Sequence, residues 1–280
     1  MTTIFKREIG SYFHGMIGYV LTAFLLGATG LYFLALNLGY GLPDFGYYTL
    51  YNSLFVLLVY APVLAMRSLS EERHSRTDQL LLTSSVSLWE IVLGKYLAMC
   101  AVFALPCLAD AGMILVLRAL GGSSASLASN LAALLCYFLL GCAALAVGEF
   151  CSSLTENQII AAVGCFGVLL LAYLMPGLRS MFSAGSAAAL VVFAGLAALF
   201  SLGVGLRSKS LLAGCISFAV LCLGLSALFW FRSAWLIEAF VPFESFVNGV
   251  FSVPSVVYYL TVSALFLFFT VQVLDRRRWN

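Results

Sequence analysis

The side chains of this protein that could bind a partner or carry a proton are concentrated in one stretch. The segment from Arg67 to Lys95 holds 8 of the 26 charged residues of the chain (14 basic and 12 acidic). Near the centre of a membrane span each such charge costs about 2.5–3.5 kcal/mol. We therefore expect the segment to lie in water between two membrane helices, where a soluble partner can bind it.

Ionisable residues inside apolar segments are further candidates for function. Asp110 lies in an apolar run shortly after Pro106. Two interpretations of Asp110 stay open: a polar point on a substrate or proton path, or an outer-leaflet carboxylate that reaches water or a neighbouring arginine. Glu149 lies near the inner end of another apolar run, and we expect its side chain to extend to the cytoplasm.

Motifs for catalysis and metal binding are absent from the sequence. There is no G-x-x-x-x-G-K-[ST] phosphate loop, no H-E-x-x-H and no G-x-S-x-G. The chain is therefore predicted not to be an enzyme, and the energy for uphill transport must come from elsewhere. The 8 cysteines form no C-x-x-C and no cluster with histidine, so we interpret them as packing residues and expect no metal site.

The composition indicates an all-α polytopic membrane protein. Hydrophobic residues make up 63% of the chain and charged residues 9%, whereas a soluble domain carries about 25% charged residues. The net charge of +2 comes from scattered basic residues, which argues against nucleic acid as a partner.

About eight segments are long and apolar enough to cross a bilayer, which takes about 20 residues. They are Met16–Leu36, Leu50–Met66, Val92–Leu117, Leu127–Phe150, Asn157–Pro176, Ala187–Leu206, Leu211–Trp230 and Ser255–Leu274. Pro62 is expected to kink the second segment or to mark its end. With the N-terminus inside, 11 of the 14 Lys and Arg residues fall on the inner side, so both termini are predicted to be cytoplasmic.

Shorter patterns predict how these spans are connected. Residues 1–15 form an amphipathic helix on the inner leaflet, with Lys6, Arg7 and Glu8 on its polar face. Ser87 and Glu90 form a capping box for the third span, and either Ser153 with Glu156 or Thr155 with Gln158 caps the fifth. Residues 231–254 are rich in Phe and Trp, including Phe243 and Phe246, and suit a helix or re-entrant hairpin in the outer interface.

Three sequence patches resemble a known family. They are Met66-Arg-Ser-Leu-Ser-Glu-Glu-Arg73 with Thr77-Asp-Gln-Leu-Leu-Leu-Thr-Ser84 and Trp89-Glu-Ile-Val-Leu-Gly-Lys95, then Ser152-Ser-Leu-Thr-Glu-Asn-Gln-Ile-Ile160, then Phe243-x-x-Phe246-x-x-Gly249 with Arg277-Arg-Trp279. The chain resembles a type-2 ABC transporter permease, of the subgroup with the gliding-motility and copper-processing nitrous-oxide permeases. The resemblance covers the whole chain except residues 187–230, which form an extra helix pair beside the family's six-helix core.

The resemblance implies a single transmembrane permease domain over residues 1–280, with a cytoplasmic coupling loop at residues 67–91. In that family this loop docks in a groove of the ATPase subunit. The implied ATPase-coupling residues are Glu71, Glu72, Arg73, Thr77, Leu80, Leu81 and Thr83. The link between the fourth and fifth spans provides a second cytoplasmic contact, at Thr155, Glu156 and Asn157.

The resemblance also implies partners and a function: the membrane subunit of an ABC exporter in the bacterial cytoplasmic membrane. ATP and Mg would bind to a separate ATPase subunit with a Walker A motif. A second permease half, identical or a sister chain, would complete the transporter, and an accessory extracytoplasmic protein is a further candidate partner. The scarcity of fixed charge in the spans favours an apolar or amphipathic substrate. Two alternatives stay open: an ion-coupled secondary transporter with Asp110 as proton carrier, and a membrane scaffold for extracytoplasmic partners.

Overall fold

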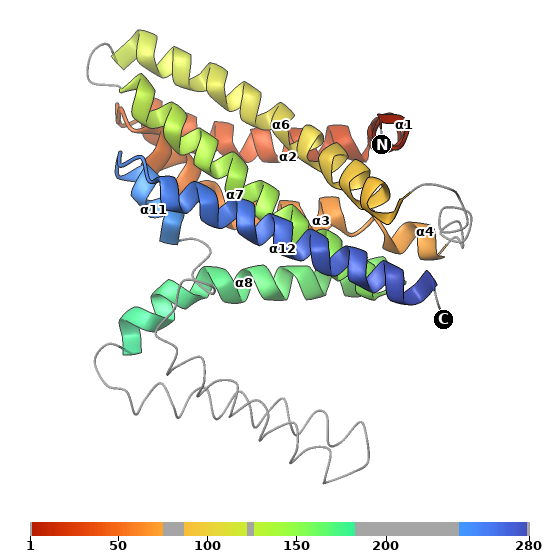
Figure 1. Cartoon of the computed structure of the whole chain (residues 1–280). Helices are drawn as coiled ribbons and strands as arrows, with labels where there is room; N and C mark the ends of the chain where they lie inside the picture. The colour runs from red at the N-terminus through yellow and green to blue at the C-terminus, as the bar shows by residue number, and fades with distance from the viewer. Residues whose placement is uncertain (1, 75–86, 122–125, 183–240, 279–280) are drawn as a thin grey trace. The chain divides into compact units, whose positions relative to one another are not determined.

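The computed structural model describes residues 2–74, 87–121, 126–182 and 241–278 of the chain (Figure 1). These residues form helices joined by turns, and none of them lies in a β-strand. The chain divides into two compact units, Met1–Leu171 with Phe240–Asn280, and Ala172–Ala239. The helices described below form the first unit. Of the second unit the structure describes only residues 172–182, at the end of helix α8.

The described helices differ widely in length, from 5 residues in α4 to 34 residues in α6. In chain order they are α1 (Thr2–His14), α2 (Ile17–Tyr32), the π-helices η1 (Phe33–Leu38) and η2 (Gly46–Tyr51), α3 (Asn52–Ala65), α4 (Ser70–His74), α6 (Leu88–Gly121), α7 (Leu127–Leu154), α8 (Gln158–Phe182), α11 (Val241–Val247) and α12 (Val253–Arg278).

Among the described residues, 5 helical stretches are long and apolar enough to cross a membrane: Ile17–Leu38, Gly46–Arg73, Leu88–Gly121, Leu127–Leu154 and Val253–Arg276. They match the first four predicted spans and the last. A shorter apolar helix, Gln158–Leu174, lies where the fifth span was predicted. The predicted spans at 187–206 and 211–230 lie outside the described residues. The prediction of an all-α polytopic membrane protein is confirmed.

Helix α7 lies at the centre of this unit, in contact with α3, α6, α11 and α12. Small residues on α7 allow the close approach, because a larger side chain would occupy the space of a neighbouring helix. A Cβ atom at Gly141 would collide with the Phe103 ring of α6, and one at Gly148 with the Cβ atom of Ala65 on α3. The same Gly148 position faces the Cys165 Sγ atom of α8 at 3.4 Å.

Two local predictions at helix ends can be compared with the structure. Pro62 lies inside α3 and does not mark its end, since the Met66 amide donates a hydrogen bond to the Pro62 carbonyl (2.9 Å); the alternative, a kink at Pro62, stays a prediction. At the start of α8 the Asn157 side chain accepts a hydrogen bond from the Ile159 amide (2.9 Å). Asn157 therefore caps this helix, and neither predicted capping box does.

Other local predictions fared differently. Ser87 caps α6 as predicted, through a hydrogen bond from the Glu90 amide to its hydroxyl (3.3 Å). Residues 2–14 form the predicted N-terminal helix. In the segment 231–254, Phe243 and Phe246 of α11 are buried in the bundle, where Phe243 contacts Tyr137 (ring centroids 6.1 Å apart). Their predicted position at the outer interface, as a helix or a re-entrant hairpin, stays a prediction.

Candidate functional site

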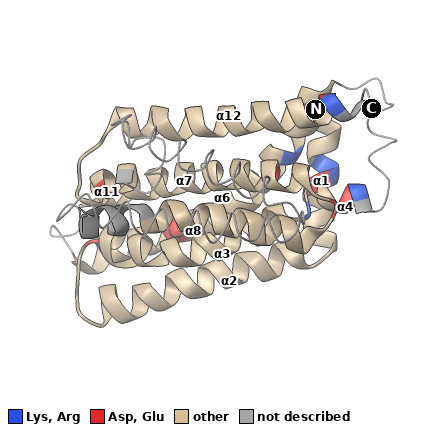
Figure 2. Ribbon diagram, turned by 90° about the horizontal axis from the view of Figure 1, so that it is seen from below, with Lys and Arg blue, Asp and Glu red and all other residues tan. Residues whose placement is uncertain are grey.

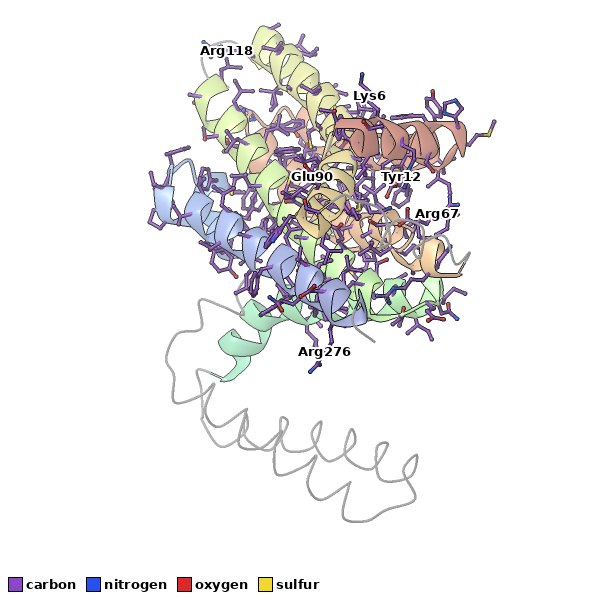
Figure 3. The ribbon with its side chains drawn as sticks, turned by 45° about the vertical axis from the view of Figure 1, so that its right-hand side comes forward. Lys6, Tyr12, Arg67, Glu90, Arg118 and Arg276 are labelled. Carbon is purple, nitrogen blue, oxygen red and sulfur yellow. The ribbon has the colours of Figure 1, made fainter. Side chains whose placement is uncertain are left out.

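Charged residues gather at one end of the bundle, near α1 and α4 (Figure 2). We call this the charged end; it consists of α1, the segment Met66–His74, the first turns of α6 and the last turns of α7. In Figure 3, Arg67 and Tyr12 lie at this end, and Arg118 lies far from them, toward the other end of α6. The helices thus bring together residues that are distant in sequence.

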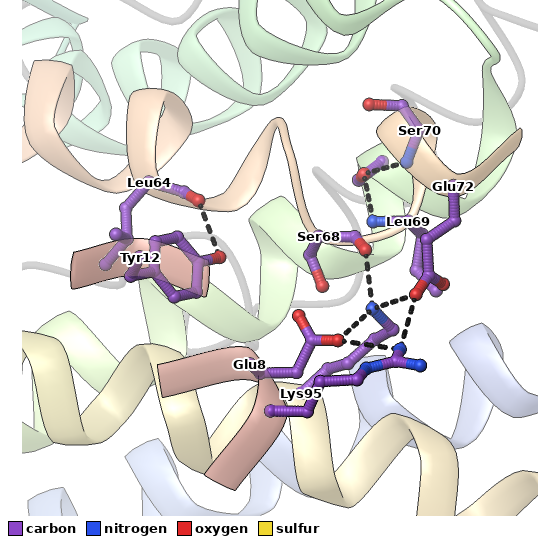
Figure 4. Close-up of polar contacts among 10 residues, drawn as sticks. Glu8, Tyr12, Leu64, Ser68, Leu69, Ser70, Glu72 and Lys95 are labelled. Carbon is purple, nitrogen blue, oxygen red and sulfur yellow. Dashed lines mark hydrogen bonds and ion pairs between the residues drawn. The ribbon is translucent and has the colours of Figure 1, made fainter. Parts of the chain in front are cut away.

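Lys95 of α6 is the central cation of the charged end. Although its side chain is charged, only 1% of it is exposed, and it lies in a predominantly apolar helix. Its Nζ atom is 3.1 Å from Glu8 Oε1, 3.0 Å from Glu72 Oε1 and 2.9 Å from the Ser68 carbonyl oxygen (Figure 4). An ammonium group has three N–H donors, so each donor has one acceptor. Lys95 thereby joins α1, the segment Met66–His74 and α6.

Arg7 closes this network from the solvent side. Its Nη2 atom lies 3.1 Å from Glu8 Oε1 and 2.9 Å from Glu72 Oε1, the same two oxygens that bind Lys95. Two cations and two carboxylates therefore alternate around one cluster. The Arg7 side chain is 56% exposed, and exposed ion pairs contribute about 0–1 kcal/mol. The buried Lys95 contributes more to the integrity of the cluster, since removal of one partner from a buried pair costs about 3–5 kcal/mol.

The segment Met66–His74 is also attached to α7. The Ser152 hydroxyl accepts hydrogen bonds from the amides of Leu69 (3.1 Å) and Ser70 (3.0 Å). It also donates one to the Met66 carbonyl (3.3 Å). These contacts satisfy backbone groups at the turn between α3 and α4, which would otherwise be buried without partners. The turn is therefore fixed to α7 as well as to α6.

Two pairs on the outside of this segment complete the arrangement. Arg67 binds Glu71 through two hydrogen bonds of 2.7 Å each, a bidentate pair one helical turn apart. On the other side, the Tyr12 hydroxyl of α1 donates a hydrogen bond to the Leu64 carbonyl of α3 (3.2 Å). Burial raises the pKa of Tyr12, and the nearby carboxylates of Glu8 and Glu149 raise this pKa further. The hydroxyl therefore remains a donor at neutral pH.

The structure describes three of the predicted coupling residues. The Glu71 side chain is 44% exposed, whereas Glu72 is 17% exposed and faces Lys95. Arg73 is buried. The other predicted coupling residues, Thr77, Leu80, Leu81 and Thr83, lie outside the described residues.

The predicted second contact lies in the three-residue link between α7 and α8. Glu156 and Asn157 are exposed there. The Thr155 hydroxyl donates to the Asn157 carbonyl (3.0 Å). The exposed carboxylate of Glu156 is accessible to a partner.

Asp110 lies in the interior of the bundle, on α6, and is fully buried. Its Oδ1 atom accepts a hydrogen bond from the Thr29 hydroxyl of α2 (2.9 Å). Within the described residues its Oδ2 atom has no hydrogen-bond partner. The carboxyl group is thus shielded from water and held by a neighbouring helix.

Sequence reasoning missed the roles of Glu8, Lys95 and Ser152, and it was wrong about Glu149. Glu8 was placed on the polar face of α1, but its side chain is only 13% exposed and binds Lys95. Glu149 was expected to reach the cytoplasm, but it is fully buried. The one available signal was Lys95 itself, because a lysine at the start of an apolar run needs a partner or water.

The described residues contain no group of three or more His, Cys, Asp or Glu side chains that could hold a metal ion. What the charged end offers is a set of ion pairs and hydrogen bonds that joins helices α1, α6 and α7 to the segment Met66–His74. This arrangement can position elements and transmit movement.

The fold and the charged end define the class: a helical membrane protein with several spans and a polar surface at one end. The family model of the ABC-2 family transporter protein matches residues 34–236. This is more than half of the chain, which therefore belongs to the ABC-2 transporter family and is a membrane-spanning permease subunit. Membership implies an ABC ATPase as partner and a dimeric arrangement. No curated protein and no solved structure matches the chain.

Proposed function

We propose that this permease subunit belongs to an ABC exporter and that its charged end receives the separate ATPase subunit. The observation that carries this proposal is the position of Lys95, which joins α1, α6 and the segment Met66–His74 through three short contacts. This segment leads directly into residues 75–86, where Thr77, Leu80, Leu81 and Thr83 are the proposed contacts with the ATPase. Glu71, Glu72 and Arg73 lie at the near side of the same loop.

The contacts of the charged end give a path for the movement. A displacement of the loop would act on α4, then through Glu72 on Lys95 of α6, and through Glu8 on α1. Helix α6 runs without interruption for 34 residues, about 51 Å at 1.5 Å per residue. A shift at the charged end would therefore be carried along α6 to the other end of the bundle, as a change between inward and outward states requires.

The energy source in this proposal is ATP with Mg, bound by the ATPase partner. The sequence has no phosphate-binding loop of its own. Thr155, Glu156 and Asn157, in the exposed link after α7, form the second contact with that partner. A short link between two helices suits this role because it moves with both of them.

The charged end faces the cytoplasm in this proposal, and the membrane is the bacterial cytoplasmic membrane. The distribution of Lys and Arg supports this orientation, which also places both termini inside. We place the chain in the subgroup of gliding-motility and nitrous-oxide permeases on the strength of the three sequence patches. A second permease half, identical or a sister chain, completes the transporter, and an accessory extracytoplasmic protein is a further proposed partner.

The proposed substrate is apolar or amphipathic. In the parts of the described spans away from the charged end (residues 17–38, 46–66, 96–117, 127–148 and 253–274), Asp110 is the one charged residue, and it is buried against Thr29. A translocation path formed by such helices would offer few ionic contacts to a strongly charged molecule, which would have to leave water without compensation.

The test is purification of the tagged chain from its own host in mild detergent, with the Glu71→Ala/Glu72→Ala variant beside it. We expect a soluble protein with a Walker A motif to co-purify in stoichiometric amount with the wild type and to be lost or strongly reduced with the variant. Asp44→Ala is the matched control, because Asp44 is exposed and lies outside both the predicted coupling loop and the network. A chain that purifies alone and transports along a proton gradient would refute the proposal.

A further inference from the structure

Glu149 is a buried carboxylate of the charged end that takes no part in the network described above. It lies on α7, one turn before Ser152, and is fully buried. Neither of its carboxylate oxygens has a hydrogen-bond partner among the described residues. A buried carboxylate without a partner is costly, because it loses the hydration of the charge and gains nothing in exchange. Such a group is expected to have a partner in another state of the protein.

Residues of several neighbouring helices surround Glu149. Lys95 and Cys100 of α6 and Glu8 of α1 act on it electrostatically. Tyr12 of α1 is also within reach of its charge. Beside it, Gly148 faces Ala65 of α3 and Cys165 of α8, which close the space on those sides. Of these groups Lys95 is the only cation.

The Lys95 ammonium has an acceptor for each of its donors in this structure, but two of these acceptors belong to a segment that is expected to move. Two of its three acceptors, Glu72 and the Ser68 carbonyl, belong to the segment Met66–His74. A displacement of this segment would remove both and leave Glu8 as the remaining acceptor. The ammonium, only 1% exposed, would then need a new acceptor, since an uncompensated buried charge is strongly destabilising. A lysine side chain is flexible enough to turn toward one.

We propose that Glu149 is the second acceptor of Lys95. When the segment Met66–His74 moves, the ammonium leaves Glu72 and Ser68 and pairs with Glu149, while Glu8 of α1 remains its other acceptor. Glu149 is thus a positioning residue for the transport cycle, and the pair Lys95–Glu149 stabilises the state in which the loop is displaced. This inference rests on the proposed function, which supplies the movement of the loop.

The exchange makes a prediction that depends on the nucleotide state. Glu72 stabilises the nucleotide-free complex, and Glu149 stabilises the ATP-bound complex. A residue with a merely structural role would affect both states alike. The isosteric variants Glu72→Gln and Glu149→Gln remove the charge and keep the shape, and Asp44→Asn is the control on an exposed carboxylate outside the predicted coupling loop.

The experiment uses the complete complex of permease and ATPase in lipid nanodiscs, either without nucleotide or trapped with ATP and vanadate. We measure the apparent melting temperature of each state and the fraction of complex that vanadate traps. We expect Glu72→Gln to lower the melting temperature only without nucleotide, and Glu149→Gln only in the trapped complex. Glu149→Gln should also reduce the trapped fraction about tenfold at equal ATP, which corresponds to about 1.4 kcal/mol. Asp44→Asn should change neither.

A combined variant tests whether Glu149 acts through Lys95. In the background of Lys95→Met, Glu149→Gln should have no further effect on trapping, because the cation that it would bind is absent. Glu149→Met, which has a similar length and no charge, serves if Glu149→Gln does not fold. Equal effects of Glu149→Gln in both nucleotide states, or additive effects with Lys95→Met, would overturn the exchange. A wild-type chain with no ATPase bound would refute the proposed function itself, before any variant is compared.

Discussion

Replacement of Lys95 by methionine tests the charged end at its centre. Methionine has a similar length and is apolar, so it fills the space of the lysine stem and removes the ammonium alone. Three contacts are lost, to Glu8, Glu72 and the Ser68 carbonyl. Breaking a buried pair costs about 3–5 kcal/mol. Arg7 still binds both carboxylates, so we expect a loss at the lower end, about 3 kcal/mol in the free energy of unfolding.

The assay is reversible unfolding of the purified chain in mixed micelles, in which the denaturing detergent is titrated. Lys6→Met is the matched control, because Lys6 is exposed on α1 and such surface changes usually stay within about 0.5 kcal/mol. A Lys95→Met variant that lost no more stability than Lys6→Met would refute the reasoning. The contacts of the ammonium with α1 and the segment Met66–His74 would then contribute nothing to the free energy of unfolding.

Three further changes test other parts of the account. Ser152→Ala removes the acceptor of two buried amides and should cost about 1–3 kcal/mol in the same unfolding assay, whereas Ser153→Ala, which loses only a bond within its own helix, should cost less; equal losses would contradict the special position of Ser152. Gly148→Ala should lower the free energy of unfolding by about 1–3 kcal/mol through overpacking. The control Gly164→Ala, at a position with open space around it, should be neutral or slightly stabilising in the helix. Both are measured in the same unfolding assay, and a neutral Gly148→Ala would mean that the helices can move apart without cost. Asp110→Asn should leave ATP-driven transport in proteoliposomes within about threefold of wild type, because an amide can still accept the hydrogen bond from a neighbouring hydroxyl; abolished transport would favour the proton-carrier alternative.

Much of the fold follows from hydropathy alone. A run of about 20 apolar residues has few options other than to cross a bilayer as a helix, so the predicted span at residues 127–150 differs from α7 (Leu127–Leu154) only at one end. Capping was harder to predict, because several side chains near the start of α8 could serve. Asn157 was overlooked although Asn is among the preferred capping residues.

The charged end could be predicted only in part. The loop stood out because charge is rare in this chain, but the partners of Lys95 did not: Glu8 is 87 residues away in sequence, and a local pattern holds no information on such pairs. The error on Glu149 has a similar origin. Helices α3 and α8 approach α7 closely at Gly148 and help to enclose this part of the helix. That approach is a property of the packed structure, which a local sequence pattern does not contain.

The central claim is that the charged end receives an ATPase, and site-specific photo-crosslinking tests it most directly. A photoreactive amino acid is placed at Glu71, whose side chain is 44% exposed, or at Tyr40, which is 76% exposed beyond the opposite end of the first span. After illumination in the native host membrane, the account predicts a crosslink from position 71 to a soluble protein with a Walker A motif, and none from position 40. A crosslink to that protein from position 40, or no crosslink from position 71, would contradict it.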